Sequence, residues 1–186
     1  MDGDKMYKHC TTEESVSRQR QIEHCLLELM HSFPYPQITI VQICQRAGVS
    51  RKCFYRYFGS KDDCLFGLID HCIMDGASYY LPNHNEIPYV RGIYERFFSY
   101  WKYMEPLLNV LDGNNLSLHL VDRMLEYLNT EERNFHQYLG GNIGESYEKM
   151  LFLVSGIMGL VLNWHRSGYA KSVSQMAAIM ESVLPN

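Results

Sequence analysis

Residues 39–63 contain three helix starts, and this density of helix signals constrains the fold more than any other feature of the sequence. Thr39, Ser50 and Ser60 are residue types that accept a hydrogen bond from the free backbone N–H groups at a helix start. Each precedes a segment in which apolar residues recur at helical spacing. Gly48 stands where the first of these helices needs a left-handed residue at its end. The stretch therefore predicts short helices joined by tight turns.

The middle helix, expected over about Arg51–Phe58, is too short to be stable alone in water. Phe54 and Phe58 are four residues apart, so they share one helix face, which we expect to pack on the neighbouring helices. The remaining side chains then face outward: Arg51, Lys52, Tyr55 and Arg56.

The rest of the chain is also predicted to be helical. Helical spacing of apolar residues predicts a first helix over residues 12–31, with Thr11 and Glu14 at capping-box spacing. A break is expected at 75–88, and no alternation typical of strands and no internal repeat is found. Further helices are expected over 61–72, 90–104, 107–111, 116–128, 130–139, 145–166 and 174–184, with a turn at Gly140. The predicted fold is all-α, with a three-helix domain at 1–74 and a larger helical domain at 75–186.

Charge is distributed unevenly along the chain. The protein has a net charge of −4, yet the span from Thr39 to Lys61 holds five basic residues and no Asp or Glu. Two short helices joined by a tight turn, the second one basic, have the geometry of a helix-turn-helix that enters the major groove of DNA. Arg51 and Lys52 would then meet base edges, while Tyr55, Arg56, Tyr57 and Lys61 would hold phosphates. The alternative is an ordinary solvated helix face.

The residues from Thr39 to Leu68, TIVQICQRAGVSRKCFYRYFGSKDDCLFGL, resemble the N-terminal domain of the tetracycline-repressor (TetR) family of bacterial regulators. The resemblance rests on the Thr-capped helix with Ile43, on Ala47-Gly48-Val49-Ser50, on Phe54-Tyr55-x-x-Phe58, and on Ser60-Lys61 with the acidic pair that follows. The sequence departs from the pattern at Lys52 and Cys53, where many members have Gly or Ser/Thr followed by Thr or Ser. A longer side chain at position 52 should change which bases are read, so no operator sequence is carried over.

The resemblance implies a homodimer of all-helical subunits. Each subunit would present one helix-turn-helix, and its C-terminal domain would bind a small molecule that alters the affinity for DNA. Carried over by position, Thr39 and Lys61 look like phosphate contacts, Tyr55 and Tyr57 like contacts to the DNA backbone, and Arg51 and Lys52 like base readers. The expected DNA-binding set is Thr39, Ser50, Arg51, Lys52, Tyr55, Arg56, Tyr57 and Lys61.

The run Met150–Leu162 is apolar around most of its circumference, so its helix must be buried on both sides. With 13 residues it is too short to span a bilayer, which takes about 20. One side suits the core of the subunit, and the other needs a partner unless the helix is the centre of a monomer. The resembled family forms its dimer interface from the last two long helices. The implied interface residues are Phe152, Ser155, Gly156, Gly159, Leu162, Met176, Ile179 and Met180.

Residues 94–103 carry six aromatic side chains at helical spacing. Such a stripe more often forms core than a ligand cage. If a pocket is present, polar groups nearby could orient a ligand in it. The predicted pocket residues are Phe97, Trp101, His119, Tyr127 and Trp164, and nothing in their spacing specifies the ligand.

The six cysteines all fall within the first 72 residues, without a CxxC pair. No N-terminal apolar segment resembles a signal peptide, so reduced thiols in a cytoplasmic protein are expected. His-Cys occurs three times, but adjacent residues on a helix diverge by about 100°, so no metal site is expected. No cofactor is expected either.

These observations predict a homodimeric DNA-binding transcription regulator, a repressor that responds to a small-molecule effector and acts on a palindromic operator. An enzyme is the less favoured reading, since no nucleophile–base pair, paired carboxylates, phosphate loop or metal spacing is present. A non-transcriptional DNA-binding protein on the same scaffold, either architectural or acting in cell division, is the other alternative. A constitutive repressor without an effector also remains open.

Overall fold

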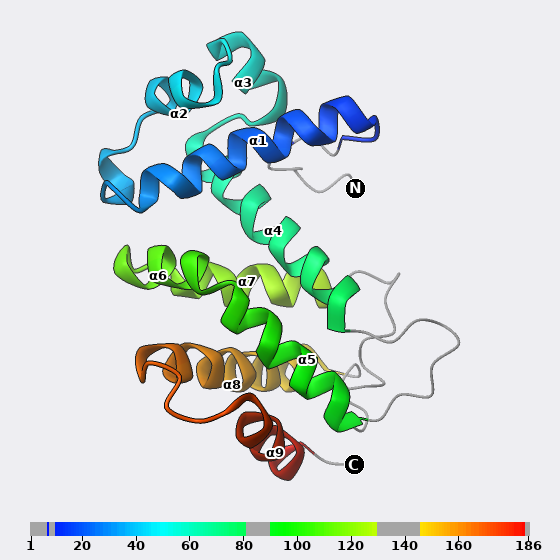
Figure 1. The fold of residues 1–186 in the computed structure, drawn as a ribbon. Helices are drawn as coiled ribbons and strands as arrows, with labels where there is room; N and C mark the ends of the chain where they lie inside the picture. Colours follow the sequence, from blue (N-terminus) through cyan, green and yellow to red (C-terminus); the bar gives the residue numbers. More distant parts are fainter. Residues whose placement is uncertain (1–6, 8–9, 81–89, 130–145, 185–186) are drawn as a thin grey trace. The chain divides into compact units, whose positions relative to one another are not determined.

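The protein folds as a series of α-helices (Figure 1). The computed structural model describes all residues except 1–6, 8–9, 81–89, 130–145 and 185–186. Within the described residues no strand forms, and the expected all-α fold is confirmed. The elements are α1 (Glu13–Met30), the 3-10 helix η1 (Tyr35–Gln37), α2 (Ile40–Ala47), α3 (Arg51–Tyr57), α4 (Lys61–Tyr80), α5 (Val90–Tyr103), α6 (Glu105–Gly113), α7 (Ser117–Leu128), α8 (Tyr147–Arg166) and α9 (Val173–Val183).

The predicted helix boundaries around α2 and α3 are confirmed by hydrogen bonds. The Thr39 side chain accepts from the backbone N–H of Gln42, and the Gln42 side chain accepts from the backbone N–H of Thr39. Gly48 ends α2 with φ +63°, a conformation that costs a residue with a Cβ more than it costs glycine. Ser50 accepts from the N–H of Cys53 at 3.1 Å, and Ser60 accepts from that of Asp63 at 3.0 Å.

Two of the predicted boundaries are wrong. The N-cap of α1 is Thr12, which pairs with the N–H of Ser15, so Thr11 and Glu14 form no capping box. The expected break at 75–88 does not begin at Asp75, because α4 continues to Tyr80. The predicted helix at 130–139 and the turn at Gly140 lie outside the described residues.

The extension of α4 has a packing reason. Ile73, Ala77 and Tyr80 recur on one face and are each at most 1% exposed. Gly76 lies inside this part of α4. Its lack of a side chain leaves room for an aromatic ring that packs against the helix. A Cβ at Gly76 would lie 2.6 Å from a ring carbon of Tyr100. The hydroxyl of Tyr100 in turn donates to the backbone carbonyl of Cys72 at 2.5 Å.

The chain divides into two compact units, which are described separately. The first comprises residues 1–71 together with 110–115. Its core is formed by fully buried apolar side chains from α1, α2, α3 and α4, namely Ile22, Leu26, Ile43, Phe54, Phe58, Leu65 and Ile69. Short α2 and α3 are therefore held in place by long α1 and α4, as the length argument requires.

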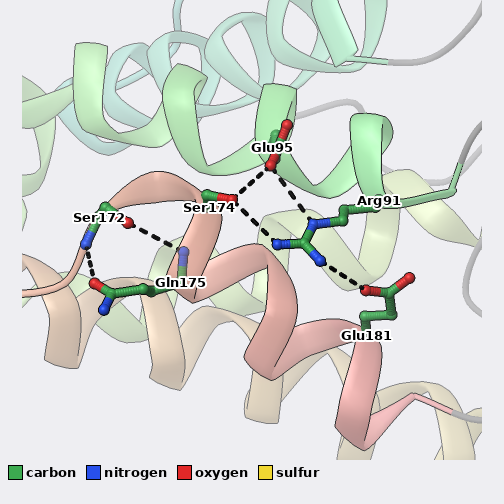
Figure 2. Close-up of polar contacts among 6 residues, drawn as sticks. All are labelled: Arg91, Glu95, Ser172, Ser174, Gln175 and Glu181. Carbon is green, nitrogen blue, oxygen red and sulfur yellow. Dashed lines mark hydrogen bonds and ion pairs between the residues drawn. The ribbon is translucent and has the colours of Figure 1, made fainter.

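The second unit comprises residues 72–109 and 116–186. Aromatic residues of α5 dominate its core, and Phe98 packs edge-on against Trp164 of α8 with ring centroids 5.6 Å apart. At the surface, Figure 2 shows α5 joined to α9 by polar contacts centred on Arg91. Arg91 donates to Ser174 at 3.1 Å and lies 3.7 Å from the carboxylates of Glu95 and Glu181. Figure 2 also shows the Ser172–Gln175 capping box that starts α9.

Candidate nucleic-acid interface

Helix α3 has one face buried and one face exposed. Phe54 is 0% exposed and packs against Phe58 with ring centroids 5.5 Å apart. Opposite this buried face, Arg51 and Lys52 in the first turn are exposed, and Tyr55 is 47% exposed. The predicted base-reading residues are therefore on the surface, at the end of α3 where a major-groove helix presents its side chains.

Helix α2 is tied to α1 by two polar contacts. Gln21 of α1 donates to the backbone carbonyl of Ala47 at 3.1 Å, which satisfies an acceptor at the end of α2. Arg46 donates to the Glu28 carboxylate at 2.6 Å, and the Arg46 guanidinium lowers the pKa of Glu28 below its ordinary value. Arg46 is thus paired with Glu28, whereas Arg51 and Lys52 of α3 are exposed.

Tyr57 lies differently from the other predicted contacts to the DNA backbone. Its side chain is only 4% exposed, and its hydroxyl accepts a hydrogen bond from Arg56 at 2.8 Å. The Arg56 guanidinium also lies 4.9 Å from the centre of the Tyr57 ring. The buried ring of Tyr57 thus supports Arg56, which is itself exposed.

Lys61 also makes contacts within the protein. Its ammonium donates to the backbone carbonyls of Tyr35 and Ile38 at 2.7 and 2.8 Å and lies 4.1 Å from the centre of the Tyr35 ring. Partial burial lowers the pKa of Lys61. The Thr39 hydroxyl is likewise engaged by the Gln42 side chain and backbone. Both residues hold the segment that leads into α2.

Several residues that position this site carried no sequence signal. The Tyr35 hydroxyl donates to Asp62, and the Asn114 side chain accepts from the Tyr35 backbone N–H at 2.5 Å. Near the N-terminus, Tyr7 donates to Asp70 at 2.5 Å. Each contact joins residues far apart in the chain, and no local spacing could have predicted it.

A small apolar cavity of about 30 Å³ lies in the second unit. Of the five predicted pocket residues only Phe97 lines it. Trp101 is fully buried, and Trp164 donates to the carbonyl of Lys171 at 2.8 Å, while His119 and Tyr127 are half-buried on α7. The cavity is lined by Tyr80, Ile93, Tyr94, Phe97, Met124, Leu128, Val154, Ile157, Met158 and Met180.

The predicted interface residues of α8 and α9 fall into two groups. Phe152 is 82% exposed, and Ser155, Gly156 and Gly159 share its exposed face. Leu162, Met176 and Met180 are instead buried inside the second unit, and Ile179 is half-buried. Ser155, Gly156 and Gly159, all three predicted as interface residues, lie as small residues on one exposed side of α8.

Among the described residues, no group of three or more His, Cys, Asp or Glu side chains is placed to hold a metal ion. All six cysteines are free thiols. None of the described helices is both long and apolar enough to cross a membrane.

Residues 26–68 match the profile of the bacterial regulatory proteins of the tetR family. Over 58 residues the chain is also 34% identical to the nucleoid occlusion factor SlmA of Shewanella amazonensis, an alignment that covers 31% of this chain and 29% of that protein. The chain thus matches less than a third of the length of this curated relative.

Solved structures resemble the chain over nearly its whole length. The fatty acid degradation regulator FadR from Bacillus halodurans has a TM-score of 0.60 at 16% identity, covering 94% of this chain and 96% of that one. A TetR transcriptional regulator from Streptococcus agalactiae has the same TM-score and identity, covering 92% and 96%. At these identities the likeness establishes a shared fold.

Replacing Lys61 tests whether its ammonium is an anchor. Lys61→Met removes the donor of two backbone carbonyls, and we expect the free energy of unfolding to fall by about 1–3 kcal/mol. Lys52→Met, which removes an exposed lysine from α3, serves as the control and should change stability little. Urea unfolding followed by circular dichroism measures both. Equal stabilities of the two variants would contradict the anchoring role.

Proposed function

We propose that this chain, which belongs to the tetR family of bacterial regulatory proteins, acts as a homodimeric repressor that binds a palindromic operator and responds to a small-molecule effector. The observation that carries the proposal is the exposed, carboxylate-free basic face of α3, which the buried Phe54 holds outward. The family match is to DNA regulators rather than to an enzyme.

The residues of this site divide into readers and supports. Arg51 and Lys52 read bases, since a guanidinium donates two parallel hydrogen bonds to guanine and an ammonium donates to the same acceptors. Tyr55 and Arg56 are exposed on the same helix, where they can reach the phosphates next to those bases. Ser50, Thr39 and Lys61 fix the backbone of the helix-turn-helix, and any phosphate contact they make adds to that role. The buried Tyr57 accepts a hydrogen bond from Arg56 and so holds its guanidinium in place.

A homodimer fits both the DNA and the exposed face of α8. One short reading helix gives poor affinity, whereas two helices spaced by a turn of DNA, or by a multiple of one, give useful specificity. Phe152 is a large apolar side chain almost fully exposed to solvent. Gly156 and Gly159 beside it have open space where a Cβ would lie, so another backbone can approach closely. We assign this face of α8 to the dimer interface, with Ile179 of α9 at its edge.

An effector would enter the apolar cavity of the second unit. Tyr80 of α4 lines that cavity, and α4 begins at Lys61 in the helix-turn-helix unit. The cavity of about 30 Å³ has room for roughly one water molecule, so an effector must move its walls apart. Because the lining is apolar, we expect an uncharged apolar effector. It would act by binding more tightly to the arrangement that does not bind DNA.

A second candidate function follows from the alignment with the nucleoid occlusion factor SlmA. On this reading the chain binds many sites across the genome rather than one near its own gene. The two functions share the same helix-turn-helix and differ in the distribution of their DNA sites.

The reading role of α3 is tested by the double substitution Arg51→Ala/Lys52→Ala. Each lost base contact is worth about 1–3 kcal/mol, so preference for the DNA flanking the gene over scrambled DNA should fall at least about tenfold. Lys171→Ala, which removes an exposed lysine from the second unit, should keep the preference. Fluorescence anisotropy measures both. An unchanged preference in the double variant would rule out α3 as the reader.

The dimer interface is tested by Phe152→Asp. A charge on this exposed apolar face should disfavour self-association, and sedimentation equilibrium should show the wild type as a dimer and the variant as a monomer. Leu118→Asp on α7 is the matched control, because Leu118 is 75% exposed but lies outside α8. A variant that stays dimeric would place the interface elsewhere.

The effector site is tested by screening uncharged apolar compounds for loss of the anisotropy of a protein–DNA complex. Val154→Phe enlarges a side chain in the cavity wall, and it should make the protein insensitive to any active compound while DNA affinity is kept. Inhibition that persists in Val154→Phe would exclude this cavity as the site. If no compound acts, the repressor is constitutive.

A further inference from the structure

A groove of about 340 Å³ lies between the first turns of α1 and the end of α3. On the α1 side, Glu14, Ser15 and Arg18 are spaced by one and three residues and share one helix face, and Thr11 lies just before the N-cap Thr12. From α3 comes Arg56. The groove is lined by Cys10, Thr11, Thr12, Glu14, Ser15, Arg18, Arg56 and Tyr57.

Two guanidinium groups of this groove come from different helices. Arg18 donates from Nη1 to the side chain of Gln21 at 2.8 Å, and Arg56 donates from Nη2 to the Tyr57 hydroxyl at 2.8 Å. A guanidinium carries five N–H donors, so each arginine keeps donors for an anion in the groove. The aligned peptide dipoles at the start of α1 add positive potential at the same place.

We propose that this groove holds a phosphate of the DNA backbone next to the bases that α3 reads, with Arg18 and Arg56 donating to it. The inference rests on the proposed function and extends its interface to α1, which the helix-turn-helix motif does not include. Arg56 connects the two surfaces: it lines the groove and stands four residues after Lys52, on the same face of α3.

Glu14 should weaken phosphate binding in the groove, whereas the two arginines strengthen it. Its carboxylate lines the groove and acts electrostatically on Arg56, so it opposes an incoming phosphate. A free phosphate dianion would meet this repulsion without other support. A phosphodiester carries a single charge and is held by the neighbouring contacts of α3, and it is therefore the occupant that we infer.

The test measures affinity for a random-sequence DNA duplex across a salt series, because a phosphate contact is independent of sequence. Affinity falls as salt rises, and in Arg18→Ala the slope of log affinity against log salt should become less negative by about 0.9 for each bound subunit. Glu14→Gln should raise affinity at low salt by about two- to fivefold, as expected for removal of one exposed charge. Glu13→Gln is the matched control, since Glu13 is in the same first turn of α1 but does not line the groove.

Circular dichroism should show all three variants folded, since the substituted side chains lie at the surface or on the groove. Calorimetric titration with inorganic phosphate alone, against chloride at equal ionic strength, should give no binding. Binding that Arg18→Ala abolishes would overturn the DNA assignment in favour of a site for a free anion. A slope unchanged in Arg18→Ala, together with equal affinities of Glu14→Gln and Glu13→Gln, would overturn the groove proposal alone. A wild type without salt-dependent affinity for any duplex would overturn the proposed function as well.

Discussion

Burial of Phe54 in the core of the first unit is the interaction on which the proposed site depends. A helix of seven residues does not persist alone in water, so α3 exists only because its apolar face is held. Phe54 is fully buried and Phe58 is 1% exposed, and together they fix which side of α3 is left to solvent. The outward direction of Arg51 and Lys52 follows from that burial. Core packing thus determines where the positive charge is presented.

The polar residues around α3 divide between holding the protein together and facing solvent. Lys61, Thr39 and Tyr57 belong to the motif by sequence, yet all three use their polar atoms on neighbouring groups of the protein. Arg46 is paired with Glu28. On α3 the exposed cations are Arg51, Lys52 and Arg56, and the groove that α3 shares with α1 adds Arg18. An acidic protein can therefore attract DNA locally, because the field close to a charge outweighs a small net charge spread over the molecule.

Local signals were enough to predict the helix-turn-helix, because each capping side chain bonds to a backbone N–H only three residues away. Local signals did not predict the features that depend on packing between residues far apart in the sequence. The continuation of α4 through Gly76 depends on the ring of Tyr100, and the inward direction of Met176 and Met180 depends on the core that α9 covers. Of the predicted pocket residues only Phe97 lines the cavity, whose wall is formed by aliphatic, methionine and aromatic side chains from five helices. The groove joins Arg18 to Arg56, which no spacing relates. The domain boundary expected at residue 74 stays a prediction.

The most direct test of the central claim is the affinity of the wild-type protein for DNA flanking its own gene compared with scrambled DNA of equal length, measured by anisotropy over a range of salt concentrations. The account predicts binding to the flanking fragment at least about 10³-fold tighter at physiological salt, with two subunits per site and a steep salt dependence. Equal affinity for both fragments would contradict a local repressor. Mapping of binding sites across the genome would then decide for or against the second candidate function.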